Sequence, residues 1–331
     1  MRVLVTGASG MLGREVATAL LARGDVVTTL QRRPSGIAGA RDVRGSVDDA
    51  DAVAAAAGGQ DAVVHLAAKV SFAGPLAEFE RTNVDGTRLL LEAARAGGAE
   101  RFVFVSSPSV AHTGASIVGE GAGPAQPKRA RGHYARTKAA AELLALAADA
   151  PGFAVVAVRP HIVWGPGDTQ LVQRVVDRAR AGRLPRLDAG AALIDTTYVD
   201  NAVSAIVAAL DRAEAAHGEA FVVTNGEPRP VFELIAAMCR AGGVPAPRWA
   251  VPGAVARAAG GLIEKAWAVR PGRDEPPMTR FLAEQLSTAH WFDLRRTLEA
   301  LGWRPGVSLD EGFARLAEYY RRQPQAARNV K

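Results

Sequence analysis

The sequence is poor in several features that define whole classes of protein. It contains one cysteine, Cys239, so an internal disulfide bond is excluded. No run of about 18 uncharged apolar residues occurs, which argues against a membrane-spanning helix. The N-terminus lacks the long apolar region and cleavage site of a secretory signal. No group of histidine, cysteine and aspartate has metal-ligand spacing, so we expect no metal. These absences lead us to expect a soluble cytoplasmic protein, with membrane association left open.

Lysine is also scarce, because only five of the 40 basic residues are lysines. The net charge is +6, but the arginines are scattered among acidic residues and do not form a basic stripe. We therefore expect no nucleic-acid partner. Abundant arginine with little lysine is typical of a biased base composition, which makes each lysine more informative than each arginine.

The first half of the chain alternates short apolar runs with helical patterns. The runs that predict buried strands are 3–6, 26–30, 62–66, 102–105 and 153–158. The helical patterns lie near 11–23, 48–57, 75–97 and 133–149. This alternation predicts an α/β fold with a doubly wound parallel sheet, a Rossmann core.

The regular alternation of strand and helix patterns ends at about residue 160. The elements expected there are helices near 168–182 and 199–215 and strands at 192–197 and 220–223. The last of these strands should rejoin the sheet, and the chain after residue 226 should be mostly helical. We expect residues 1–160, rejoined by about 195–225, to form the dinucleotide-binding core. Residues 161–194 and 226–331 should form a smaller, mostly helical substrate lobe.

Two segments leave alternatives open. Residues 112–132 are rich in glycine and proline, and are either a functional loop or poorly ordered. His112 and His133 flank this segment; they could gate a site, but solvation in the loop is favoured. Residues 251–270 have a mostly apolar, helix-like pattern, which fits a substrate lid, a membrane-surface helix or the core of the lobe.

A glycine motif follows the first predicted strand. "VLVTGASGMLG" places Gly7, Gly10 and Gly13 between this strand and the opening of a helix. Such a turn brings backbone N–H groups and a helix N-terminus against a pyrophosphate. The alternative, a plain glycine-rich turn, is less favoured in this context.

The end of the second strand bears on the choice of cofactor. NAD-specific sites usually place Asp or Glu there, but this chain has Gln31, Arg32 and Arg33. A guanidinium suits a 2′-phosphate, so we expect NADP(H) in preference to NAD(H). Composition bias could explain one arginine, but explains the missing acid less well.

A tyrosine and a lysine form a candidate pair for proton transfer. Tyr134 and Lys138 are four residues apart in a predicted helix and therefore share one face. Free tyrosine has a pKa near 10, and a nearby ammonium lowers the pKa, as proton exchange with a carbonyl requires. Ser106, Ser107 and Ser109 follow a predicted core strand, where open α/β sheets bind their ligands.

Together these motifs resemble the extended short-chain dehydrogenase/reductase superfamily. The supporting stretches are "HLAA", "NVDGT", "RPHIVWGPGD" and "YVDN", and the likeness covers essentially the whole chain. It implies that Tyr134 is the general acid/base. Lys138 would bind the nicotinamide ribose and tune Tyr134, and Ser107 would hydrogen-bond the substrate oxygen.

The same likeness suggests further site residues. The cofactor would be bound by Gly7, Ser9, Gly10, Met11, Leu12, Gly13, Gln31, Arg32, Arg33, Ser46, Val47, Ala67, Ala68, Lys69, Asn83, Tyr134, Lys138, Pro160 and Ile162. The chain departs from the family at Ser46, where an Asp often contacts adenine. Substrate candidates are Ser109, His161 and Arg280. His161 is alternatively a packed histidine at a strand end, and Arg280 a surface helix residue.

Within the superfamily, the chain looks most like the 3β-hydroxysteroid and sterol-4-carboxylate dehydrogenase branch. "SSPSVAH" and "MTRFLAEQLSTAHWFD" are most similar to the bacterial 2-alkyl-3-oxoalkanoate reductases of long-chain olefin biosynthesis. The resemblance implies an NADPH-dependent ketoreductase acting on a bulky apolar small molecule. Alternatives are a 3β-hydroxysteroid or sterol-carboxylate dehydrogenase, a nucleotide-sugar epimerase or dehydratase, and an NADP-sensing regulator. By analogy we expect a homodimer; association with a membrane or with pathway enzymes stays open.

Overall fold

The computed structural model describes residues 1–71, 74–269, 284 and 286–323. Its main feature is a seven-stranded sheet with the order β12-β7-β5-β4-β1-β2-β3, in which every neighbouring pair is parallel. The strands are β1 (Arg2–Thr6), β2 (Val26–Gln31), β3 (Arg41–Arg44), β4 (Ala62–His65), β5 (Arg101–Val105), β7 (Ala154–Pro160) and β12 (Ala220–Val223). The five predicted strands of the first half are confirmed, and residues 220–223 rejoin the sheet as predicted. The exposed edge strand β3 was missed because its sequence, RDVR, is short and charged.

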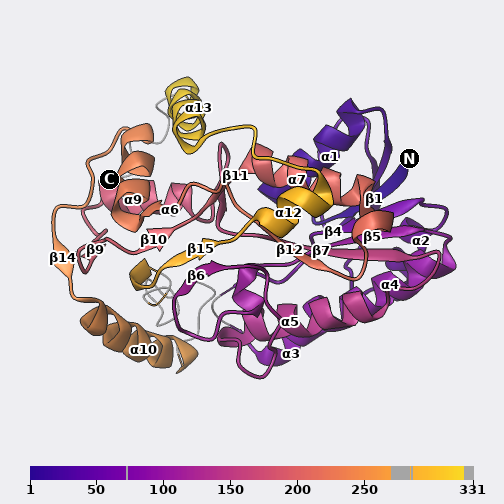
Figure 1. The fold of residues 1–331 in the computed structure, drawn as a ribbon, viewed down its shortest axis with the longest axis horizontal. Helices are drawn as coiled ribbons and strands as arrows, with labels where there is room; N and C mark the ends of the chain where they lie inside the picture. The colour runs from indigo at the N-terminus through magenta and orange to yellow at the C-terminus, as the bar shows by residue number, and fades with distance from the viewer. Residues whose placement is uncertain (72–73, 270–283, 285, 324–331) are drawn as a thin grey trace.

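Helices cover both faces of this sheet (Figure 1). On one face lie α1 (Met11–Ala22), α7 (Val199–Asp211) and the short α8 (Ala213–Ala216); on the other lie α2 (Ala50–Ala57), α4 (Gly86–Ala96) and α5 (Gly132–Ala147). Alternate strand residues supply the two cores. Val3 and Val5 pack with α1, whereas Leu4 packs on the opposite side with Leu90 of α4. The α/β fold with a doubly wound sheet is therefore confirmed.

The region predicted as one helix at 75–97 is broken into three pieces. It consists of α3 (Leu76–Phe79), the π-helix η1 (Glu80–Asp85) and α4. Asn83 lies within η1 and is buried, and its Oδ1 accepts a hydrogen bond from the backbone N–H of Lys69 at 2.7 Å. The π-helical pitch thus accompanies a tertiary hydrogen bond. The hydrophobic periodicity of the sequence gives no sign of such a bond.

A second, smaller sheet joins distant segments in the order β13-β10-β15-β6. Its strands are β13 (Arg229–Pro230), β10 (Leu193–Ile194), β15 (His290–Phe292) and β6 (Ile117–Glu120). β6 lies inside the 112–132 segment, so that segment is a structured loop and not a disordered one. The predicted strand at 192–197 is divided between β10 and β11 (Thr197–Tyr198), and β11 pairs with β8 (Val163–Trp164).

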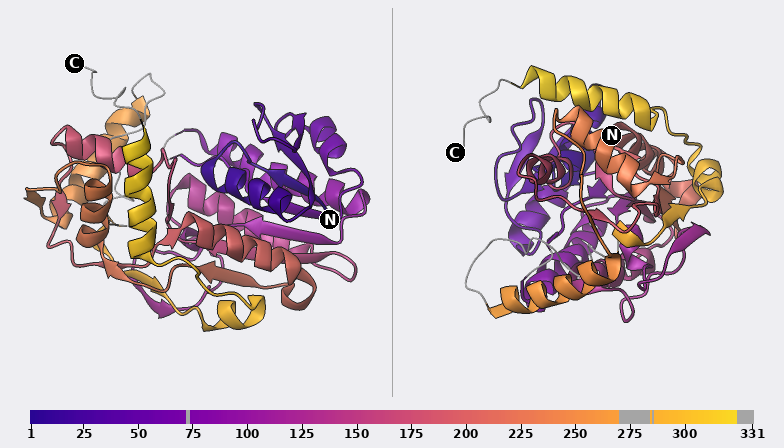
Figure 2. Two further views of the ribbon diagram at one scale, coloured as in Figure 1. Left: turned by 90° about the horizontal axis from the view of Figure 1, so that it is seen from above. Right: turned by 90° about the vertical axis from the view of Figure 1, so that its left-hand side faces the viewer.

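The smaller lobe contains most of the remaining helices and lies at one end of the large sheet (Figures 1 and 2). Its elements are α6 (Val172–Arg180), β9 (Arg186–Leu187), α9 (Val231–Ala241), β14 (Ala250–Val251), α10 (Gly253–Val269) and α13 (Leu309–Arg322). The 3-10 turn η2 (Pro108–Val110) and α12 (Arg295–Leu301) lie along the large sheet. Strands β13, β14 and β15 make the chain after residue 226 more mixed than the mostly helical structure predicted. Among the described helices, none is long and apolar enough to cross a bilayer.

Helix α10 corresponds to the apolar segment predicted at 251–270. Ala256 is buried against Leu187, while Val255 and Leu262 are exposed. The helix therefore contributes to a small core of the lobe and leaves part of its apolar surface uncovered.

Candidate active site

A cavity of about 920 Å³ opens where the large parallel strands end. It extends from the glycine turn after β1, past the residues that follow β4, β5 and β7, to the strands β6 and β15. Its position at the carboxyl ends of parallel strands is the usual ligand site of an open α/β sheet. The predicted site residues that line it are Gly7, Ser9, Gly10, Met11, Leu12, Gly13, Ala68, Ser107, Ser109, Tyr134, Lys138, Pro160, His161 and Ile162.

The glycine turn has little space for side chains. Gly7 has φ +79°, and a Cβ there would lie 2.8 Å from the backbone nitrogen of Ala67. A Cβ on Gly13 would lie 2.4 Å from the carbonyl oxygen of Gly7. Gly10 precedes α1 without a side-chain cap, so the first N–H groups of the helix remain available at the cavity. The turn therefore fits a dinucleotide pyrophosphate.

Three cofactor candidates, Gln31, Arg32 and Arg33, lie at the end of β2 and directly after it, and none of them lines the cavity. Gln31 is buried, and neither its amide nitrogen nor its amide oxygen has a partner among the described residues. Arg32 and Arg33 are exposed, and no ion pair links either of them to the described part of the chain.

Several other cofactor candidates lie behind the cavity wall. The N–H of Ala67 donates to Thr6 Oγ1 at 3.1 Å. Asn83 Nδ2 donates to Thr137 Oγ1 at 3.0 Å, and Lys69 forms an ion pair with Glu78. Val47 is buried in the core and Ser46 is half-buried. These residues, Ser46, Val47, Ala67, Lys69 and Asn83, do not line the cavity.

A serine and a tyrosine meet in the centre of the site. The Ser107 hydroxyl is hydrogen-bonded to Tyr134, which lies in the first turn of α5. Ser107 Oγ also accepts from the Ser109 N–H at 3.3 Å and from the Ser109 hydroxyl at 3.0 Å. Burial raises the pKa of Tyr134 to about 12, and the Ser107 hydrogen bond opposes this rise. Tyr134 is therefore protonated at neutral pH.

Lys138 is buried beside this pair. Its Nζ donates to the carbonyl oxygen of Val105 at 2.7 Å and lies 4.0 Å from the centre of the Phe104 ring. Burial lowers the pKa of Lys138 to about 7, and Glu142 partly opposes this shift. The pKa of Tyr134 is thus raised overall, contrary to the sequence-based expectation of a lowered value, because desolvation of the phenol is the largest effect on it.

The segment after β7 carries an unusual backbone conformation. Ile162 lines the cavity at φ +45°, a region that β-branched residues rarely adopt. The neighbouring His161 donates from Nδ1 to the carbonyl oxygen of Asp195 at 2.6 Å, and its ring lies 5.0 Å from that of Phe292. His161 is thus both a packed histidine and a cavity residue. Strained conformations of this kind collect at functional sites.

The sequence analysis missed the far wall of the cavity. Ile117 of β6 and both His290 and Phe292 of β15 line it. His112 is only 2% exposed and lines the cavity, so the expectation of a solvated loop histidine was wrong. It is buried because β6 and β15 pair over it, and a contact between residues near 117 and 290 leaves no local signal. Arg280 lies outside the described residues.

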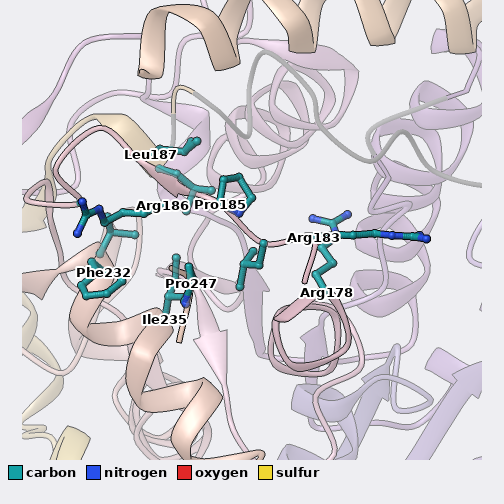
Figure 3. Close-up of a pocket in the computed structure, with 12 residues that line it drawn as sticks. Arg178, Arg183, Pro185, Arg186, Leu187, Phe232, Ile235 and Pro247 are labelled. Atoms are coloured by element: carbon teal, nitrogen blue, oxygen red, sulfur yellow. The ribbon is translucent and has the colours of Figure 1, made fainter. Parts of the chain in front are cut away.

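A second cavity of about 220 Å³ lies within the lobe (Figure 3). It is lined by apolar residues of α9 and by three arginines, Arg178, Arg183 and Arg186. The Arg186 guanidinium lies 5.4 Å from the centre of the Phe232 ring. This cavity contains no serine, tyrosine or histidine, so it does not provide the acid–base groups of the larger one.

The fold, with a cavity at the carboxyl ends of its parallel strands, is that of a nucleotide-dependent oxidoreductase of the short-chain dehydrogenase/reductase type. The chain belongs to the NAD dependent epimerase/dehydratase family, whose model matches residues 3–224. It is 40% identical over 325 residues to a 2-alkyl-3-oxoalkanoate reductase of Stenotrophomonas maltophilia, covering 96% of this chain and 98% of that protein.

Other similar proteins differ in their substrates. A 3-beta-hydroxysteroid dehydrogenase of Mycolicibacterium neoaurum is 29% identical, covering 96% of this chain and 90% of that protein. Among solved structures, MoeE5 in complex with UDP-glucose and NAD has a TM-score of 0.74 and is 25% identical, covering 97% of this chain and 99% of MoeE5. The fold is therefore shared by enzymes that act on different substrates.

Proposed function

We propose that this protein is an NADPH-dependent ketoreductase that converts a 2-alkyl-3-oxoalkanoic acid to the 3-hydroxy acid. The observation that carries this proposal is the contact between Ser107 and Tyr134 beside buried Lys138, in one cavity with the glycine turn. The similarity to 2-alkyl-3-oxoalkanoate reductase supports the substrate class. The apolar wall formed by Ile117, Val163 and Phe292 suits alkyl chains.

The hydrogen bonds of Ser107 determine what its own hydrogen can do. Because Ser107 Oγ accepts two bonds from Ser109, its O–H is the group that bonds to Tyr134, and a ketone oxygen bound beside Tyr134 can accept this hydrogen in its place. A bound nicotinamide supplies hydride to the ketone carbon. Ser107 then stabilises the negative charge that develops on the oxygen, and Tyr134 donates a proton to it. Reduction requires Tyr134 in its protonated form, which is the form that burial favours.

Lys138 is placed to stabilise the phenolate that remains after proton transfer. Its position is set by the Val105 carbonyl and the Phe104 ring. In the family likeness this lysine also contacts the nicotinamide ribose. An ammonium one helical turn from Tyr134 makes loss of the tyrosine proton less costly once the site is closed to water.

The choice of NADPH over NADH is part of the proposal. The exposed Arg32 and Arg33 follow β2, where no carboxylate is present to hold a ribose 2′-hydroxyl. A 2′-phosphate would be a favourable partner for either guanidinium.

The direct test measures NADPH oxidation with a freshly prepared 2-alkyl-3-oxoalkanoate beside a 3-ketosteroid. We expect the oxo acid to be reduced and Tyr134→Phe to lower turnover about 10²- to 10⁴-fold. NADPH binding, followed by nicotinamide fluorescence, should stay near wild type, because the ring still fills its place. Tyr319→Phe on α13 is the matched control, since that hydroxyl bonds only to Gln323 among the described residues. Normal turnover by Tyr134→Phe would refute the assignment, and reduction of the steroid alone would refute the substrate.

A further inference from the structure

Three buried histidines form a cluster in the wall of the active-site cavity. His112, His161 and His290 come from different parts of the chain, and all three line the cavity. The ring of His290 lies 4.8 Å from that of His112 and 5.9 Å from that of His161, centre to centre. The Nε2 atoms of His112 and His290 are 3.1 Å apart. The proposed chemistry of Ser107, Tyr134 and Lys138 uses none of these imidazoles.

The hydrogen bonds around His290 determine which nitrogen is free. The Thr288 hydroxyl donates to the Glu284 carbonyl oxygen at 2.7 Å, so Thr288 Oγ1 can only accept from His290 Nε2, 3.1 Å away. His290 Nε2 therefore carries a hydrogen, which is also directed at His112. The remaining nitrogen, Nδ1, is buried and has no partner among the described residues. His290 is 1% exposed, so a nitrogen without a hydrogen-bond partner there costs desolvation free energy, unless a ligand forms a hydrogen bond with it.

The cluster adjoins the catalytic serine through one short turn. Ser107 precedes the 3-10 turn η2, and its Oγ accepts from the Ser109 hydroxyl at 3.0 Å. At the end of the same turn the His112 N–H donates to the Ser109 carbonyl oxygen at 3.3 Å. In a 3-oxo acid the carboxylate is two bonds from the ketone carbon. A substrate whose ketone oxygen meets Ser107 thus has its carboxylate in this neighbourhood.

We propose that His290 is the binding residue for the substrate carboxylate, and that it takes up a proton from solvent to bind it as an imidazolium. This inference rests on the proposed function and names the part of the cavity that distinguishes an acid from an uncharged ketone. The Nδ1–H of the imidazolium donates to the carboxylate, while Nε2–H keeps its bonds to Thr288 and His112.

The surroundings of His290 explain why it is neutral without a ligand. Burial and the neighbouring His161 and His112 lower the pKa of His290 to about 3. Directly after the adjacent strand β10, the Asp195 carboxyl accepts from the Thr224 hydroxyl at 2.7 Å and from the backbone N–H of Glu227. Asp195 is thus already hydrogen-bonded, and in the described part of the chain no carboxylate forms an ion pair with His290.

The two charged groups beside His112 have opposite effects on its pKa. Glu284 and Arg131 pair at 2.9 Å, and they shift the pKa of His112 in opposite directions. A substrate carboxylate would therefore be the anion that favours protonation of His290. Because His290 is neutral in the free protein and protonated in the complex, binding should weaken as pH rises from the pKa of the free protein toward the pKa in the complex, and should change no further above that value.

The first experiment uses the stable product, a 2-alkyl-3-hydroxyalkanoic acid, and its methyl ester with the NADP⁺-bound enzyme. Calorimetry in buffers of different ionisation enthalpy should show proton uptake on acid binding that grows as the pH is lowered from 7 to 5, and none for the ester. Acid binding without proton uptake would overturn the proposal.

The second experiment compares His290→Phe with wild type. The ring volume is retained, so affinity for the acid should fall about tenfold or more, while that for the ester is unchanged. His217→Asn is the matched control, because His217 is exposed and bonds to Asp149 far from the cavity. Unchanged preference for acid over ester in His290→Phe would overturn the proposal. If the methyl ester of the 2-alkyl-3-oxoalkanoic acid is reduced by Tyr134-dependent chemistry in both proteins, the ketoreductase assignment stands independently of this outcome.

Discussion

At the residue scale, the proposed preference for NADPH rests on the residues at the end of β2. Arg32 and Arg33 are exposed and follow this strand, whereas Gln31 is buried and its amide has no partner among the described residues. An exposed guanidinium contributes little to folding, so a change at these two positions should affect ligand binding more than stability.

The prediction is that Arg32→Ala combined with Arg33→Ala raises the KM for NADPH about 10- to 100-fold. The KM for NADH should remain near its wild-type value, because NADH lacks the phosphate. Steady-state kinetics with both cofactors measures this difference. Arg248→Ala, an exposed arginine of the lobe, is the matched control. Equal losses for NADPH and NADH would show that the two arginines do not recognise the phosphate.

At the element scale, α5 connects the catalytic pair to the core. Tyr134 and Lys138 occupy its first turns, and Glu142 lies one turn further along. Glu142 forms a fully buried ion pair with Arg159 of β7 at 2.5 Å, with a second hydrogen bond at 2.8 Å. This pair holds α5 against β7, and the residues at and just after the carboxyl end of β7 line the cavity.

Removing one charge of this pair should be strongly destabilising. We expect Glu142→Gln to lower the free energy of unfolding by about 3–5 kcal/mol, because Arg159 stays buried without its counter-charge. Urea denaturation measures the loss. Glu318→Gln on α13 removes an exposed partner of Arg322 and should cost less than about 1 kcal/mol. Similar losses in the two variants would mean that the buried pair contributes no more than a surface one.

At the scale of the whole molecule, buried histidines should make stability depend on pH. Burial lowers the pKa values of His65 and His290 to about 3 and that of His161 to about 4. In the unfolded chain these groups bind protons near pH 6.5, whereas the folded chain does not. Their contribution to stability is complete above pH 6.5 and is lost as pH falls toward 4. Asp195 offsets part of the loss, because burial raises its pKa to about 6.

The expected result is a free energy of unfolding that decreases as pH falls below 6.5. Between pH 7 and 8 it should rise by about 1 kcal/mol, because folded Lys138, with a pKa of about 7, loses a proton that the unfolded chain keeps. Each neutral histidine contributes up to about 1.4 kcal/mol per pH unit. Urea unfolding at pH 5, 6, 7 and 8 tests this, with His217→Asn as an exposed-histidine control that should keep the same profile. Equal stability at pH 5 and pH 8 would contradict it.

Local signals in the sequence were sufficient to predict many of the elements. Continuous apolar runs predicted every strand of the large sheet except β3, and the glycine spacing predicted the turn before α1. The Tyr134–Lys138 spacing placed two side chains on one helix face. These predictions succeeded because strand burial, glycine turns and helix periodicity depend on residues only a few positions apart.

The surroundings of Tyr134 and Lys138 became known only from the tertiary structure. The pairing of β6 with β15 brings His290 to His112 across 178 residues, and no periodicity reports such a contact. Burial reversed the expected pKa shift of Tyr134, because desolvation depends on everything packed around the phenol. The break of the 75–97 helix at Asn83 likewise follows from its bond to Lys69 on another segment. The sequence thus predicted the fold, which is confirmed, and a candidate acid, whereas the packing of distant segments set the electrostatics and the far wall of the cavity.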